Sequence, residues 1–299
     1  MKSYPHVQYV IVVILQITKD YMRKVFNIII YFFAVIGFVL LAVYMANLFG
    51  WTKTAGIVDV QHDYFKNQVT ESSKHPSWSQ TEEWNVLKEA VLKDKVAIIS
   101  AIDKTGIRPD KTNISSRLIV SVLMVEQLRL FHSNREIFKQ IFAPLKILGN
   151  QSQFSWGVMG IKQDTARQIE DNLKNSQSPW YLGKEYEHIL DYASSTKISD
   201  VDAARFARLT NENDRYFSYL YSAVLLKEIQ TQWEHAGFPI SDKPEVLATL
   251  FNIGFQNSHP NADPKSGGAQ IDIGTTTYSF GGLAGSFYYS DELLTEFPR

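Results

Sequence analysis

The stretch SRLIVSVLMVEQLRLF, residues 116–131, places one carboxylate in the middle of an apolar run. On a period of 3.6 residues, Glu126 falls near the centre of an apolar stripe. The other members of the stripe are Ile119, Val122, Leu123 and Leu130. Burial disfavours the ionised carboxylate and raises its pKa, so an acid in this position could stay protonated and act as a general acid. The alternative is a carboxylate paired with an Arg or Lys from another segment, and this stretch alone leaves both interpretations open.

The opposite face of the same predicted helix carries Arg117, Gln127 and Arg129, which we expect to reach water. Asn113 and Ser115 are the candidate first residues, because their side chains can cap a helix. The helical pattern continues into NREIFKQIFAPL, residues 134–145.

Two further blocks follow Glu126 along the chain: SQFSWGVMGIKQDTA (152–166) and EVLATLFNIGF (245–255). In this order the three blocks resemble the lysozyme-like lytic transglycosylases, the family-23 glycoside hydrolases that cut peptidoglycan. That family has a helix with one catalytic Glu, then a loop of the form G-L-M-Q-[IV]-x-P-x-T-A, then a helix ending in A-A-Y-N-A-G. The resemblance spans roughly residues 115–257, and its matching positions are Gly157, Met159, Ile161, Thr165, Ala166, Ala248, Asn252 and Gly254.

The chain departs from the family pattern at four positions. Gln127 stands where the family usually has Ser, Gly160 in place of the loop Gln, and Asp164 in place of Pro. Phe251 replaces a Tyr whose hydroxyl normally lies near the acid. These departures allow a second class of function, a glycan-binding scaffold in a cell-envelope complex that keeps the fold without cleaving.

The resemblance implies a lytic transglycosylase in which Glu126 is the only catalytic residue. As an acid it would protonate the glycosidic oxygen between N-acetylmuramic acid and N-acetylglucosamine. As a carboxylate it would then take the proton of the sugar's own 6-hydroxyl, which closes a 1,6-anhydro ring. The expected substrate-binding residues are Ser155, Gly157, Val158, Met159, Phe251 and Asn252, with backbone groups of the 157–159 loop holding the N-acetyl sugar and Asn252 orienting the acid.

Several of these residues have an equally plain structural interpretation. Met159 could fill a gap in the core, and Asn252 could cap the end of its helix. Trp156, Tyr278, Tyr288 and Tyr289 could stack on sugar rings or be buried. Glu185 and His188 have the spacing of a metal-ligand pair, but a second such pair is missing, so we expect no metal and no other cofactor.

The composition narrows the class of protein. The 299 residues carry a net charge of −1, with no basic cluster interleaved with aromatics, so nucleic acid is not an expected partner. There is no Cys, which excludes disulfides and thiol catalysis. Residues 25–49 contain no charged side chain, follow Lys19, Arg23 and Lys24, and are long enough to span a bilayer.

We therefore predict a cytoplasmic N-terminus (1–24), a transmembrane anchor (25–49), a stalk (50–80) and a periplasmic domain (81–299) on a bacterial inner membrane. A cleaved signal peptide is the rival interpretation of the apolar segment. The predicted fold is mainly α, a lysozyme-like α+β domain behind a single N-terminal transmembrane helix. Predicted helices occupy 79–102, 163–175, 178–193, 199–210, 215–237 and 242–255, and the Gly-rich tail 266–290 is expected to form loops and short strands that cover one end of the cleft.

Overall fold

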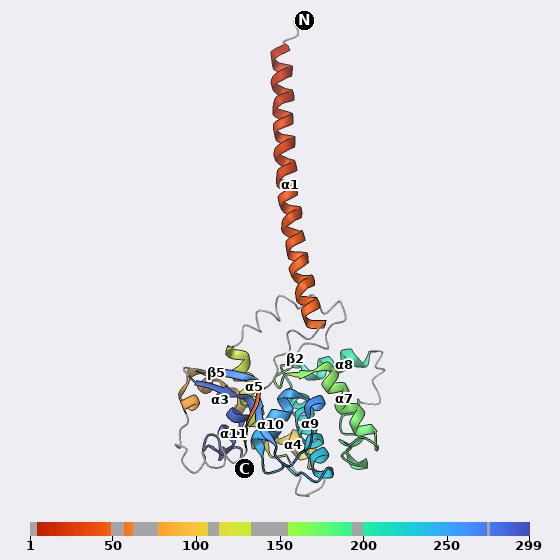
Figure 1. Ribbon diagram of the computed structural model, residues 1–299, viewed down its shortest axis with the longest axis vertical. Coiled ribbons are helices and arrows are strands. Elements are labelled where there is room, and N and C mark those ends of the chain that lie inside the picture. The colour runs from red at the N-terminus through yellow and green to blue at the C-terminus, as the bar shows by residue number, and fades with distance from the viewer. Residues whose placement is uncertain are drawn as a thin grey trace. The chain divides into compact units, whose positions relative to one another are not determined.

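The computed structural model describes residues 5–48, 57–61, 77–106, 114–132, 155–192, 200–273 and 276–299. Within these ranges the chain is mainly helical, with a few short strands (Figure 1). It divides into two compact units, Met1–Thr54 and Ala55–Arg299.

The first unit contains α1 (Pro5–Leu48), a helix of 44 residues. Its section Met22–Ala42 is long and apolar enough to cross a membrane, which agrees with the predicted span in its length and composition. A signal sequence near an N-terminus meets the same criteria. The helix begins at Pro5, far upstream of the predicted span, and so includes the apolar segment 7–17 as well.

The second unit contains the remaining helices, and the residues at several of their starts have the chemistry that begins a helix. The hydroxyl of Thr81 accepts the N–H of Trp84 at the start of α3, at 3.3 Å. Ser115 accepts the N–H of Leu118 at 3.2 Å and so caps α5, and Pro244 opens α10. These helices are α3 (Glu82–Lys93), α4 (Lys95–Thr105), α5 (Ser116–His132), α7 (Gln163–Lys174), α8 (Val201–Leu209), α9 (Tyr216–His235), α10 (Pro244–Ile253) and α11 (Phe280–Tyr289), with short 3-10 turns η1 (Ser77–Gln80), η4 (Lys184–Tyr186) and η5 (Phe255–Asn257).

Two helical predictions were wrong in detail. The helix predicted from 79 to 102 is divided at Asp94, whose carboxylate accepts hydrogen bonds from Arg215 and Tyr219 at 2.9 and 2.5 Å. The segment predicted as a helix at 178–193 forms turns around η4, because Gly183 has a left-handed φ of +113°. Helix α8 is capped by Asp200, which accepts the N–H of Ala203 at 3.1 Å. Residue 199, at which this helix was predicted to begin, and the predicted extension 134–145 of the Glu126 helix lie outside the described residues.

Within the described ranges the strands form three antiparallel pairs. One of these pairs, β1 with β4, belongs in part to the predicted stalk, because β1 starts at Ile57. Trp78, also in that segment, is 1% exposed and part of the core. The boundary predicted at residue 80 is therefore too late, and parts of the expected stalk belong to the domain. The pairs are β1 (Ile57–Gln61) with β4 (Lys265–Gly268), β2 (Ser155–Trp156) with β3 (Ile161–Lys162), and β5 (Gln270–Ile273) with β6 (Thr276–Ser279).

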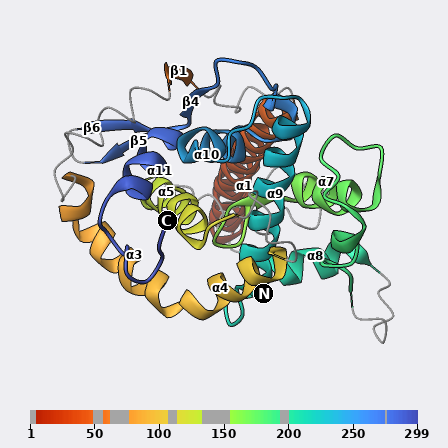
Figure 2. The same cartoon turned by 90° about the horizontal axis from the view of Figure 1, so that it is seen from below.

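Helix α5 lies in the middle of this unit and contacts α3, α4, α9, α10 and α11 (Figure 2). Its residues are buried around the whole circumference from Leu118 to Glu126, so it has no solvent face of the predicted kind there. Arg117 in its first turn is completely buried, which corrects the expectation that this side chain reaches water. Its guanidinium donates to the backbone carbonyls of Phe287, Tyr288, Ser290, Glu292 and Phe297, at 2.5–3.1 Å.

The second half of the Gly-rich tail is a helix, α11, and not the loop structure that composition suggested. Ser279 caps it by accepting the N–H of Gly282 at 3.1 Å. Glycine lowers helix propensity. Gly281 and Gly285, one turn apart, nevertheless allow α11 to lie directly against α10. A Cβ at Gly285 would meet the Cβ of Glu245 at 3.0 Å. Tertiary packing therefore overrides the local propensity of this segment.

Candidate functional site

Glu126 is 2% exposed, which confirms the burial predicted from the apolar stripe of α5. Its Oε1 forms an ion pair with Nη2 of Arg129, one turn further along the helix. The Arg129 side chain is 16% exposed, so it also does not extend freely into water as predicted. A guanidinium in contact with a carboxyl group favours the ionised carboxylate. This is the paired interpretation of Glu126, with a partner on the same helix instead of another segment.

The second block forms a hairpin whose turn, residues 157–160, joins β2 to β3. The N–H of Gly160 donates to the carbonyl of Gly157 at 3.3 Å and closes the turn. Gly157 and Gly160 both have left-handed φ values, +64° and +63°. Side chains are strained in this conformation, so glycine suits both ends of the turn.

The hairpin turn lies directly against the acid. A Cβ at Gly160 would meet Cδ of Glu126 at 2.7 Å and Oε1 at a still shorter distance. Real Cβ atoms essentially never come that close to another heavy atom. Gly160, which the sequence marks as a departure from the family loop, thus permits the closest contact between the turn and Glu126.

A side-chain hydrogen bond connects the same two elements next to that contact. Nε2 of Gln127 donates to the backbone carbonyl of Val158. On another side, Gly157 faces α9 and the end of α8, where a Cβ would meet Oγ of Ser218 at 2.8 Å. The turn is therefore held between the acid-bearing helix and the α8–α9 region.

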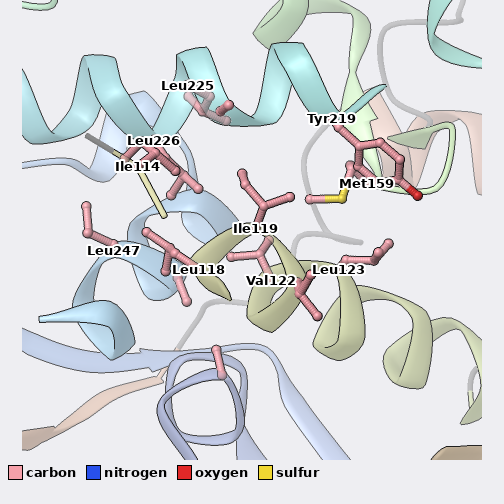
Figure 3. Packing of buried hydrophobic residues seen from close by; sticks show 14 of the residues in the cluster. Ile114, Leu118, Ile119, Val122, Leu123, Met159, Tyr219, Leu225, Leu226 and Leu247 are labelled. Atoms are coloured by element: carbon pink, nitrogen blue, oxygen red, sulfur yellow. The ribbon is translucent and has the colours of Figure 1, made fainter. Parts of the chain in front are cut away.

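Met159 is fully buried in the core. Figure 3 shows it beside Tyr219 of α9, between that helix and Ile119 and Leu123 of α5. Its side chain therefore fills the core, which is the structural interpretation that the sequence left open. Only its backbone remains a candidate for contact with a sugar.

Asn252 and Phe251, at the end of α10, have their contacts in other places. Oδ1 of Asn252 accepts the N–H of Ala269 at 2.9 Å, where β4 gives way to β5. Phe251 is half-buried and packs against the core. The structure thus brings Glu126 together with the 157–160 turn, and it joins Asn252 to the β4–β5 junction. The role of Asn252 in orienting the acid stays a prediction.

The structure says less about the other residues that were expected to contact the sugar. Ser155 pairs with Lys162 in the hairpin, and its side chain, like that of Trp156, lies outside the described part. Tyr278 is half-buried and its hydroxyl lies 2.9 Å from Oγ of Ser77. Two other aromatics of the tail, Phe280 and Phe287, are in the core. That the tail covers one end of a cleft stays a prediction.

Arg129, Gln127 and Gly160 are site residues that sequence reasoning missed. Arg129 was detectable, because a position three residues after Glu126 faces the same side of a helix. The other two stood out only as departures from the family pattern. Their contacts join segments more than thirty residues apart along the chain, which no local pattern encodes.

The candidate metal pair has ordinary polar contacts. Nδ1 of His188 lies 2.6 Å from Asp191, which also pairs with Lys174 at 2.5 Å. Together these contacts lower the pKa of Asp191, the hydrogen bond from Lys174 being the largest cause. Among the described residues, no group of three or more His, Cys, Asp or Glu side chains could hold a metal ion.

Comparison of the whole chain with models of protein families, with curated proteins and with solved structures finds no match.

Proposed function

We propose that this chain is a membrane-anchored peptidoglycan lytic transglycosylase with a divergent lysozyme-like domain, in which Glu126 is the acid and base. The observation that supports it best is the contact between the buried Glu126 carboxyl group and the Gly157–Gly160 turn. The family resemblance implies the same pair, an acid on a helix and a small-residue loop that holds the sugar.

The proposed chemistry needs one carboxyl group. Most glycosidases use two, one as acid and the other as nucleophile or base. Here Glu126 protonates the glycosidic oxygen and, once ionised, removes the proton of the 6-hydroxyl of the muramic acid, which attacks the anomeric carbon. The turn supplies backbone groups close to the acid, because glycine at position 160 lets the turn approach the Glu126 side chain.

The ion pair between Glu126 and Arg129 favours a second candidate. A general acid must carry its proton when the glycan binds, whereas Arg129 stabilises the ionised carboxylate. A domain that binds glycan strands without cleaving them, as a scaffold in a cell-envelope complex, has no need of that proton. Under this alternative, Glu126 and Arg129 hold the helix and the turn together.

Product analysis separates the two candidates. The full chain, purified in detergent, is incubated with purified peptidoglycan, and the soluble products are analysed by mass spectrometry for 1,6-anhydro ends. Glu126→Gln keeps the size of the side chain and removes the acid. Glu228→Gln is the matched control, because Glu228 is also a completely buried Glu, on α9.

Anhydro products from the wild type and from Glu228→Gln, but not from Glu126→Gln, would support the enzyme. Equal cleavage by Glu126→Gln would refute the assignment of the acid. Sedimentation of all three proteins with peptidoglycan, without any products, would favour the scaffold.

The proposed location is a bacterial inner membrane, with the domain in the periplasm. Lys19, Arg23 and Lys24 precede the uncharged run 25–49, and positive charges beside a membrane span remain in the cytoplasm. The substrate class requires the same side, since peptidoglycan lies outside the cytoplasm.

A further inference from the structure

The hairpin turn has few side chains with which to hold its position beside Glu126. Its ends are glycines, and the side chain of Met159 points into the core. Val158 contributes its carbonyl, which accepts the amide of Gln127. Gln127 follows Glu126 directly in α5, so the same helical turn carries the acid and the donor.

The space between the turn and α5 leaves little freedom for this arrangement. At Gly160 even a methyl group would overlap the carboxyl group of Glu126, and at Gly157 it would overlap the α8–α9 region. A displacement of the turn toward either side is therefore blocked by atoms already present. Movement away from α5 is opposed by the Gln127 hydrogen bond, which is partly shielded from water.

We propose that Gln127 is a positioning residue, whose amide fixes the backbone of the Gly157–Gly160 turn at the distance from Glu126 at which a glycan is bound. The inference rests on the proposed function, because it assigns the turn to the bound sugar. Gln127 acts through the turn and does not itself contact the reacting atoms. Its bond takes one of the two lone pairs of the Val158 carbonyl oxygen.

The substitution that tests this role is Gln127→Met, which keeps the length of the side chain and removes the donor. The matched control is Gln232→Met on α9. Gln232 donates from Nε2 to the backbone carbonyl of Ser258 at 3.0 Å, and its Oε1 accepts the hydroxyl of Ser258 at 2.6 Å, so its replacement removes the same kind of bond, and one more, at a different loop. A general loss of stability would affect both variants alike.

Three measurements are made on the full chain in detergent: release of anhydro products, hydrogen exchange, and sedimentation with peptidoglycan. With purified peptidoglycan, kcat for anhydro-product release should fall on the order of 10- to 100-fold in Gln127→Met, because a small misplacement of a binding group has that effect. Gln232→Met should retain the wild-type kcat. Hydrogen exchange of the backbone amides of residues 157–160 should be faster in Gln127→Met only.

The exchange measurement and sedimentation with peptidoglycan separate this inference from the proposed function. If the wild type releases no anhydro products, the enzyme proposal fails, but faster exchange together with weaker sedimentation of Gln127→Met would still support the positioning role. Wild-type exchange at 157–160 in Gln127→Met, or equal loss of activity in the two variants, would overturn it.

Discussion

Substitution of Gly160 by alanine tests the contact on which the proposed site depends. The new Cβ would lie 2.7 Å from Cδ of Glu126 and nearer to Oε1. Gly160 also has φ of +63°, where a side chain costs about 1–2 kcal/mol. Gly237→Ala is the control, because Gly237 has φ of +82° and open space around the position of a Cβ. The two variants share the backbone strain, and only one of them disturbs Glu126.

The size of the effect follows from what must move. The atoms nearest to the new methyl group belong to the end of the Glu126 side chain, so the carboxyl group gives way more easily than the backbone. This movement weakens the ion pair with Arg129, and we expect an additional loss of about 1–2 kcal/mol relative to Gly237→Ala. A displacement of the acid on the order of 1 Å should lower kcat about 100-fold, which corresponds to about 2.7 kcal/mol in the barrier.

The assay combines thermal unfolding of the two variants with release of anhydro products from peptidoglycan. We expect Gly160→Ala to fold, to melt a few degrees below Gly237→Ala, and to lose nearly all cleavage. Wild-type cleavage by Gly160→Ala would show that the place of Glu126 against the turn has no bearing on activity. Equal melting temperatures of the two variants would show that the clash was resolved without disturbing the ion pair.

Three further predictions concern stability and topology. Arg117→Met should unfold the domain or lower its melting temperature by more than about 10 °C. Five backbone carbonyls lose a charged donor, and each buried group left unpaired costs about 1–3 kcal/mol. A melting temperature within a few degrees of wild type would contradict this. Burial raises the pKa of Glu228 well above its usual value, and its Oε1 has no hydrogen-bond partner among the described residues, so the folded state holds the proton more tightly than the unfolded state does. The stability that this group contributes is therefore complete below pH about 4.3 and is lost as the pH rises toward the folded-state pKa. In chemical denaturation measured from pH 4 to 8, the free energy of unfolding should decline less with pH in Glu228→Gln than in the wild type. A phosphatase that works only when exported should be active when fused to the C-terminus, and inactivity of a stably expressed fusion would place the domain in the cytoplasm.

The sequence predicted those features that depend on local spacing. Periodicity placed α7, α9 and α10 close to their observed ranges. The burial of Glu126 followed from its position on an apolar stripe, and Ser115 marked the start of α5 because a cap acts within one turn. Each of these inferences needs only neighbours within a few residues.

Features that depend on distant partners were not predictable in this way. Arg117 looks like a surface residue, because its five acceptors lie about 170–180 positions later. The segment FGGLAGSFYY has poor helix propensity, and its helix exists because glycines let it pack closely against α10. The same applies to the site, where Gln127 and Gly160 gain their meaning from a contact across the chain.

Gln127 and Gly160, two positions at which the sequence departs from the pattern that it resembles, both lie at the contact between α5 and the 157–160 turn. The family has a small hydroxyl side chain after the acid and an amide side chain in the loop, whereas this chain has the amide after the acid and no side chain in the loop. In the structure a side chain at 160 would collide with Glu126, and the amide at 127 reaches the loop from the helix side. Either family residue would disturb this one contact: Gln at 160 would push the acid away, and Ser at 127 would leave the turn without its donor from α5. Once the first change has disturbed the contact, the second has less left to remove. The double variant Gln127→Ser with Gly160→Gln should therefore be less impaired than the sum of the two single changes, and simple additivity would show that the two positions are independent.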